Sequence, residues 1–140
     1  MAVHVLAVLA YKDGDRVTSE LLARSVNTNP VVIRRLLLVL QEARLVETRK
    51  GAGFGSRLSR SAARISLDEV FRAVEHDEAF CLPRKKPDQG CPVGQCIQSA
   101  LERVFKSALK ALENDLSRTT LADVVSTVHE CCGQASKAAK

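Results

Sequence analysis

The sequence has few aromatic residues: no tryptophan, one tyrosine and four phenylalanines among its 140 residues. Proteins that bind single strands or RNA loops by base stacking need several exposed rings. The chain also lacks any apolar run near the ~20 residues that a membrane-spanning helix requires. A base-stacking platform and a membrane protein are therefore disfavoured, whereas 46% hydrophobic and 26% charged residues are ordinary for a globular chain.

Several functional patterns are missing as well. The five cysteines are odd in number and follow no secretory signal, which argues against a secreted disulfide scaffold and favours a reducing cytoplasm. A CxxC pair matched by a second pair is absent, so a zinc site is disfavoured. The sequence has no Ser-His-Asp set and no glycine-rich phosphate loop after a parallel strand. We therefore expect a cytoplasmic protein that is not an enzyme.

The charge is unevenly distributed. Residues 1–64 carry 11 basic and 5 acidic side chains, whereas residues 65–140 carry 10 and 11, and the whole chain has a net charge of +5. Such asymmetry favours a polyanion-binding module in the first half. A solvated basic face is the alternative that charge alone leaves open.

The first half has the element order of a winged helix-turn-helix. Helical periodicity predicts helices over residues 3–11, from Thr18 or Ser19 to Val26, and from Pro30 to about residue 43. Alternation predicts strands over 45–49 and 56–59, joined by a glycine-rich tip. We predict a mainly α fold with a small β-hairpin wing, followed by a long dimerisation helix.

The chain divides into four predicted segments: a DNA-binding domain at 1–75, a cysteine-containing loop at 76–92, dimerisation helices at 93–130 and a flexible tail at 131–140. A capping box from Ser66 to Glu69 starts the last helix of the first segment. The apolar stripe on the long helix has little sequence left to cover it, so we expect a homodimer; folding back onto its own domain is the alternative. The predicted interface is Ile97, Leu101, Val104, Phe105, Ala108, Leu112 and Leu116.

The third helix would lie in the major groove of double-stranded DNA, with the wing on the backbone or minor groove. An arginine there can pair with guanine, and glycines let the wing tip approach DNA closely. A pseudo-palindromic operator would match a twofold dimer. A winged helix that binds another protein instead of DNA is the alternative. The predicted DNA-binding residues are Thr18, Thr28, Asn29, Val31, Arg34, Arg35, Arg49, Lys50, Gly51, Gly53 and Arg57.

The ordered motifs resemble the Rrf2 family of bacterial winged-helix regulators over about residues 3–128. They are Ser19–Ala23, the break before Pro30, Leu36–Val46 (LLLVLQEARLV), Arg49–Gly55, Ile65–Val70 and the CPVGQCIQSAL stretch from Cys91. The resemblance implies a dimeric DNA-binding transcription factor, usually a repressor, with the long helix as dimer interface. Relatives that bind iron–sulfur clusters carry three cysteines before and within the long helix, about six residues apart. Here Cys81, Cys91 and Cys96 stand ten and five residues apart.

Three interpretations of these cysteines stay open. A thiol switch is favoured, because a helix N-terminus and nearby cations such as Lys85 stabilise thiolates, and an oxidised thiol can be captured by a second one. A [2Fe–2S] cluster would use Cys81, Cys91 and Cys96 with a fourth ligand from His4, an acidic side chain or the partner subunit. Inert, buried cysteines with no cofactor are the third interpretation.

Overall fold

The fold is described from a computed structural model, which describes residues 1–12, 14–49, 51, 54–75, 85 and 87–138. Within these residues the chain is mainly helical, with a two-stranded antiparallel hairpin, as the sequence predicts. The elements in chain order are α1 (Ala2–Tyr11), α2 (Ser19–Val26), α3 (Pro30–Glu42), β1 (Val46–Arg49), β2 (Gly55–Leu58), the short 3-10 helix η1 (Ala62–Arg64), α4 (Leu67–Val74), α5 (Pro92–Leu116) and α6 (Leu121–Ala138).

One hydrophobic core holds together α1 to α4, the hairpin and the start of α6. On α3 the buried side chains are Ile33, Leu37 and Leu40, the helical spacing that places one stripe against the core. Leu121, the first residue of α6, is fully buried in the same core. The core therefore contains residues that precede α5 in the sequence and one residue that follows it. The body that carries α3 includes a segment more than a hundred residues from the N-terminus.

The helix-turn-helix is set by local capping signals. The Thr18 side chain accepts a hydrogen bond from the Leu21 N–H and starts α2, and Asn29 accepts one from the Val31 N–H at 2.8 Å and starts α3. Pro30 takes the first helical position, where its missing N–H costs no hydrogen bond. Between the helices Asn27 adopts a left-handed conformation (φ 57°), which asparagine tolerates. These starts confirm the positions predicted from the sequence.

The hairpin is anchored to the segment before α2. Its register pairs Val46 with Leu58 and Arg49 with Gly55. In addition, the Val17 N–H donates to the Ser56 carbonyl and the Ser56 N–H donates to the Val17 carbonyl, both at 2.8 Å. The sequence did not predict this bridge. It holds the wing beside the N-terminus of α2.

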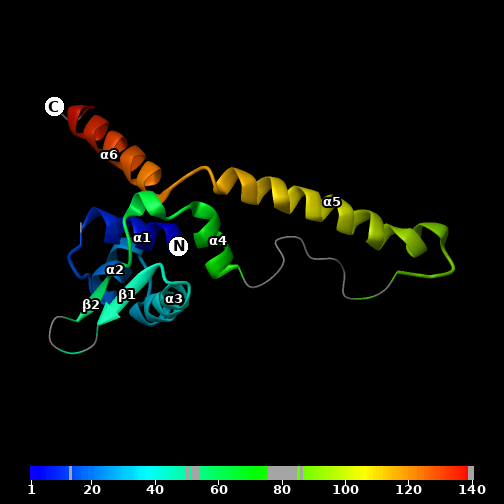
Figure 1. Ribbon diagram of the computed structural model, residues 1–140, viewed down its shortest axis with the longest axis horizontal. Helices are drawn as coiled ribbons and strands as arrows, with labels where there is room; N and C mark the ends of the chain where they lie inside the picture. The colour runs from blue at the N-terminus through cyan, green and yellow to red at the C-terminus, as the bar shows by residue number, and fades with distance from the viewer. Residues whose placement is uncertain (13, 50, 52–53, 76–84, 86, 139–140) are drawn as a thin grey trace.

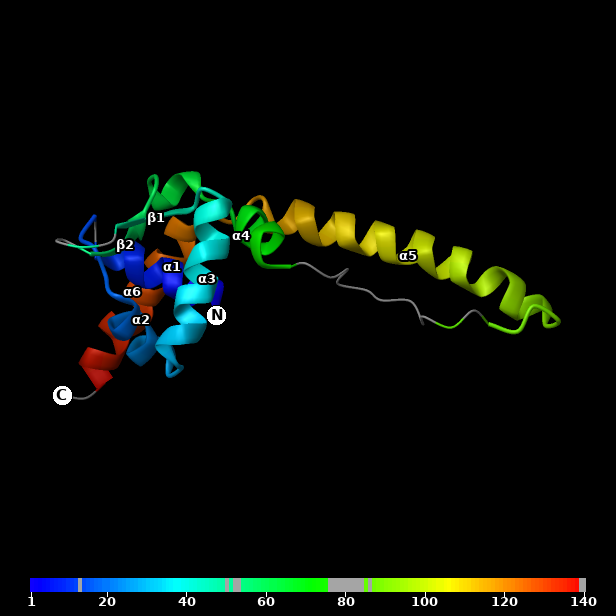
Figure 2. The same cartoon turned by 90° about the horizontal axis from the view of Figure 1, so that it is seen from below.

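α5 extends away from the body as one long helix, and α6 returns to pack on α1 (Figure 1). The view from below shows the same separation (Figure 2). The predicted dimerisation segment 93–130 thus contains two helices with different surroundings, because α6 packs on the body and α5 projects from it. α6 runs to Ala138 and therefore includes most of the predicted flexible tail at 131–140.

An ion-pair network joins α4 to the last turns of α5. The Arg72 guanidinium contacts the nearly buried Asp68 carboxylate through Nε and Nη2, each at 3.2 Å, and its Nη2 lies 3.5 Å from Glu113 Oε2. Asp68 and Arg72 stand four residues apart on one face of α4, while Glu113 belongs to α5. Arg72 thus links the orientation of the projecting helix to the body.

Candidate nucleic-acid interface

The exposed face of α3 carries the residues predicted to meet DNA. Asn29, Val31, Arg34 and Arg35 are all exposed at or near its N-terminus, and Thr28 is half-buried in the preceding turn. A helix N-terminus presents free N–H groups and a partial positive charge, both of which favour phosphate. This end of the body is therefore suited to contact a polyanion.

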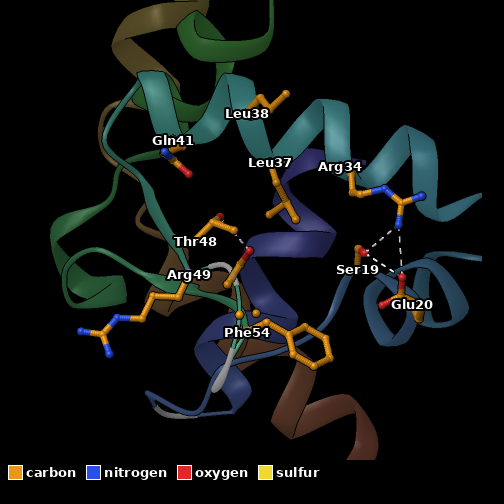
Figure 3. Close-up of a pocket in the computed structure, with 12 residues that line it drawn as sticks. Ser19, Glu20, Arg34, Leu37, Leu38, Gln41, Thr48, Arg49 and Phe54 are labelled. Carbon is orange, nitrogen blue, oxygen red and sulfur yellow. Dashed lines mark hydrogen bonds and ion pairs between the residues drawn. The ribbon is translucent and has the colours of Figure 1, made fainter.

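Arg34 on this face contacts two residues at the start of α2. Its Nη1 lies 3.2 Å from Glu20 Oε1 and donates to Ser19 Oγ at 3.4 Å, while the Ser19 hydroxyl donates to Glu20 Oε1 at 3.1 Å. Figure 3 shows the guanidinium reaching from α3 to these two residues at the start of α2. A hydrogen bond from backbone N–H, and then one from the Ser19 hydroxyl, lowers the pKa of Glu20. The carboxylate is therefore charged at neutral pH.

Arg35 and Arg49 differ from Arg34 in their surroundings. Both side chains are exposed, and within the described part of the chain neither has a hydrogen-bond or ion-pair partner. Arg49 ends β1 at the base of the wing tip, and in Figure 3 its side chain points away from α3. These two guanidinium groups are free to contact phosphate.

The wing also contains an internal ion pair. Arg57 donates from Nε and Nη2 to Glu47 Oε2 at 3.1 and 3.0 Å, across the two strands. Arg16 approaches the same carboxylate at 3.9 Å and donates to the Gly55 carbonyl at 3.2 Å. Arg57 is thus engaged in holding the hairpin. Gly51 is exposed with φ 85°, whereas Lys50 and Gly53 lie outside the described residues.

A cleft of about 720 Å³ separates α3 from the wing. Leu38 on α3 and Phe54 on the wing line it, although their side chains are 61% and 60% exposed. Figure 3 shows the Phe54 ring facing this space from the hairpin side. With α3 in the major groove and the wing on the backbone or minor groove, as the sequence predicts, DNA would pass across this cleft. Apolar side chains there can contact deoxyribose and thymine methyl groups.

Several residues that line the cleft are not among the DNA-binding residues predicted from the sequence. Leu38 follows Arg34 by four positions and therefore shares its helix face, which is a signal that the sequence contains. Phe54 was treated only as part of a glycine-rich tip. The approach of Glu20 to Arg34 depends on how α2 crosses α3, which no local pattern specifies. The cleft also involves Ser19, Gln41, Thr48 and Ser56.

The start of α5, where two of the predicted site cysteines stand, lies away from the body that carries α3 (Figure 1). Cys91 is the N-cap residue of α5 and Cys96 lies in its first turns; both are exposed free thiols. Cys81 lies outside the described residues. α1, which carries His4, lies in the body at the other end of the molecule from the start of α5 (Figure 1), and His4 Nε2 lies 3.1 Å from Ser25 Oγ. Among the described residues, no three His, Cys, Asp or Glu side chains gather as metal ligands.

α5 has no buried side chain, although it carries the predicted apolar stripe. Val104 is 60% exposed, and Ile97 and Leu112 are 36% and 38% exposed. Ala108 is exposed, while Leu101, Phe105 and Leu116 are half-buried. The helix therefore does not fold back onto its own body.

A helix-turn-helix followed by a glycine-containing hairpin, with basic side chains on the third helix and the wing, defines a winged helix-turn-helix DNA-binding protein. The family described as "Rrf2: Iron-dependent Transcriptional regulator" matches residues 1–127. The chain therefore belongs to the Rrf2 family, whose members are transcriptional regulators and not enzymes.

Individual relatives agree with this assignment. The chain is 40% identical over 125 residues to YwnA of Bacillus subtilis (strain 168), named as a candidate HTH-type transcriptional regulator; the match covers 89% of this chain and 92% of that protein. A crystal structure of a candidate DNA-binding protein is 41% identical, with a TM-score of 0.70, covering 88% of this chain and 94% of that one. T. potens IscR, 23% identical, shares the fold with a TM-score of 0.69, covering 93% and 84%.

Within the described residues, none of the helices combines the length and the apolar character that crossing a bilayer requires.

Proposed function

We propose that this DNA-binding regulator is a homodimeric repressor whose operator affinity falls when cysteine thiols near the start of α5 are oxidised. The observation that carries the proposal is α5 itself: 25 residues, no buried side chain, an exposed apolar stripe and two exposed thiols at its outer end. The exposed apolar stripe supports dimerisation, and the two exposed thiols support a sensor that is separate from the DNA-binding face.

The stripe suits a second copy of the same helix. A shallow groove on α5 is lined mainly by small side chains, together with Arg103 and Val104: Ala100, Ser107, Ala108 and Ala111. Small residues let two helices approach closely, and a twofold axis brings the same patch of both chains together. At about 1.5 Å per residue, 25 residues span about 38 Å, long enough to bury a continuous seam. A twofold dimer would read a pseudo-palindromic operator.

The thiol chemistry constrains which cysteines pair. Cys91 and Cys96 are five residues apart, so the helical rise alone separates their Cα atoms by about 7.5 Å, more than a disulfide normally spans. We therefore assign the disulfide partner of either thiol to Cys81 or to a cysteine of the second copy. Two thiols would transfer two protons and two electrons to peroxide, giving one disulfide and two water molecules.

The mechanical link from the thiols to DNA is α5. Oxidation at its outer end would shift the helix in the dimer, and the other end is tied to α4 through Arg72 and Glu113. A shift would change the spacing of the two α3 helices, which must match half-sites about one helical turn apart.

The test measures duplex affinity before and after oxidation. Operator duplexes are selected from a randomised library, and their anisotropy is followed with reduced protein, with diamide-treated protein and after re-reduction. We expect oxidation to weaken binding reversibly by about tenfold or more, the size typical of coupled sites. The Cys91→Ser and Cys96→Ser double variant should not respond, whereas Cys132→Ser, an exposed thiol on α6, should respond normally. Unchanged wild-type affinity would refute the thiol switch.

A second candidate is a sensor that holds a [2Fe–2S] cluster, favoured by the iron named in the family description. Of the three proposed cysteine ligands, the described residues include Cys91 and Cys96, so Cys81 and a fourth ligand would have to complete the set. When bound, a cluster would supply one-electron redox chemistry. Anaerobic purification with absorbance at about 300–600 nm and iron and sulfide assays tests it. A colourless protein that takes up no iron on reconstitution would exclude this candidate.

A further inference from the structure

One arginine on the recognition helix is held by residues of the preceding helix, and its neighbour is not. Arg34 Nη1 contacts both Glu20 and Ser19, at 3.2 and 3.4 Å, whereas Arg35 has no polar partner within the described part of the chain. Both guanidinium groups are exposed on the same helix, so solvent access alone does not explain the difference. The contacts instead give Arg34 a defined position.

The contacts leave the base-reading donors of Arg34 free. A guanidinium has five N–H groups: one on Nε and two on each Nη. Nη1 can satisfy Glu20 and Ser19 with its two, so Nε and Nη2 remain available side by side. Two adjacent donors are what a bidentate contact to guanine O6 and N7 requires in the major groove.

The negative charge of Glu20 also affects whether Arg34 contacts a base or a phosphate. A carboxylate 3.2 Å away offsets the positive charge that would attract a phosphate, and it repels phosphate itself. Ser19 fixes the carboxylate in turn, since its hydroxyl donates to Glu20 Oε1 at 3.1 Å. Arg35 and Arg49 carry no such neighbour, so backbone contacts fall to them.

We propose that Glu20 is a specificity-determining positioning residue: together with Ser19 it holds Arg34 so that the guanidinium reads a guanine base and not the phosphate backbone. This inference rests on the proposed function, because it requires α3 to lie in the major groove of an operator. Removing the Glu20 charge would release Arg34 to contact phosphate, so affinity for any DNA would rise while discrimination at one base pair would fall.

The experiment compares Glu20→Gln with Glu75→Gln, which makes the same change in charge at the exposed C-cap residue of α4, a residue that does not line the cleft between α3 and the wing. Wild-type protein first selects duplexes from a randomised library, and Arg34→Ala identifies the G·C pair whose preference is lost. Affinities are then measured for the selected duplex, for a duplex changed at that pair, and for an unrelated duplex, each over a range of salt concentration.

We expect wild-type protein and Glu75→Gln to discriminate at that pair by about tenfold or more, the range of one bidentate contact. Glu20→Gln should lose most of this discrimination, bind the unrelated duplex more tightly, and steepen its log–log salt slope by about one phosphate contact. A general loss of structure would not raise non-specific affinity, so the readouts separate positioning from folding.

Two results would overturn the inference while leaving the proposed function standing. One is that Glu20→Gln keeps the discrimination of Glu75→Gln; the other is that Arg34→Ala changes no base preference although wild-type protein selects an operator. If wild-type protein selects no duplex at all, the proposed function fails first and the inference fails with it.

Discussion

The wing depends on a glycine that no other residue can replace without cost. Gly55 starts β2 with φ 131°, a conformation that side chains rarely adopt, and a Cβ built there would lie 3.0 Å from the Val17 carbonyl oxygen and 3.1 Å from the Arg16 Cβ. That oxygen accepts the Ser56 N–H in the bridge that anchors the wing. A methyl group at this position would therefore strain the backbone and push the bridge apart.

The expected loss for Gly55→Ala follows from these two effects. A residue held in a sparsely populated backbone region costs about 1–3 kcal/mol, and overpacking costs about 1–3 kcal/mol. We expect the free energy of unfolding to fall by about 2–6 kcal/mol, the sum of the two effects. Gly51→Ala is the matched control, because Gly51 also has positive φ (85°) but has no atom within 4 Å of its Cβ position.

Urea unfolding followed by circular dichroism measures both variants under identical conditions. Gly51→Ala should lose only the backbone contribution, about 1–3 kcal/mol, so Gly55→Ala should be the less stable of the two. If the variants unfold at the same urea concentration, then contact with the segment before α2 does not determine the cost at Gly55 and the reasoning is wrong.

Three further predictions concern the capping box, the α4–α5 junction and the proposed dimer. Backbone and side-chain hydrogen bonds lower the pKa of Glu69. The contribution of Glu69 to stability is therefore present above its ordinary pKa of 4.5 and is lost as the pH falls through the lowered value. Glu69→Gln should destabilise the protein at pH 7 in urea unfolding, and an equal loss of stability in acid would contradict this. Arg72→Ala leaves the nearly buried Asp68 carboxylate without its bidentate partner. Because Arg72 is largely exposed, the free energy of unfolding should fall by only about 1–2 kcal/mol, measured by thermal or urea unfolding. An unchanged free energy of unfolding would show that solvent replaces the guanidinium. Val104 is exposed on the apolar stripe of α5, so Val104→Glu should yield monomers in analytical ultracentrifugation. Lys106→Glu should stay dimeric. A dimer of Val104→Glu would place the interface elsewhere.

Local chemistry made much of the body predictable. Capping by Thr18 and Asn29, the proline at the start of α3 and the capping box at Ser66 each act within a few residues, so the sequence contains the whole signal. The hairpin was predicted within one residue because strand alternation and a glycine-rich tip are also local.

Contacts between distant segments were not predictable in the same way. The bridge from Val17 to Ser56 and the burial of Leu121 join residues far apart in sequence, and no periodicity encodes which face meets which. At the interface, Arg57 satisfied the pattern of a DNA-contacting cation, yet it pairs with Glu47 across the hairpin. Charge and spacing identify a basic surface, while the tertiary structure decides which cations are free.

Selection of duplexes from a randomised library by the reduced protein tests DNA reading and dimer symmetry together, because one set of enriched sequences reports both. The account predicts an enriched inverted repeat whose half-sites are centred about 10–10.5 base pairs apart or a multiple of that, as two α3 helices of a twofold dimer require. Enrichment of a single unrepeated site, or of no sequence, would contradict a dimeric operator-binding regulator.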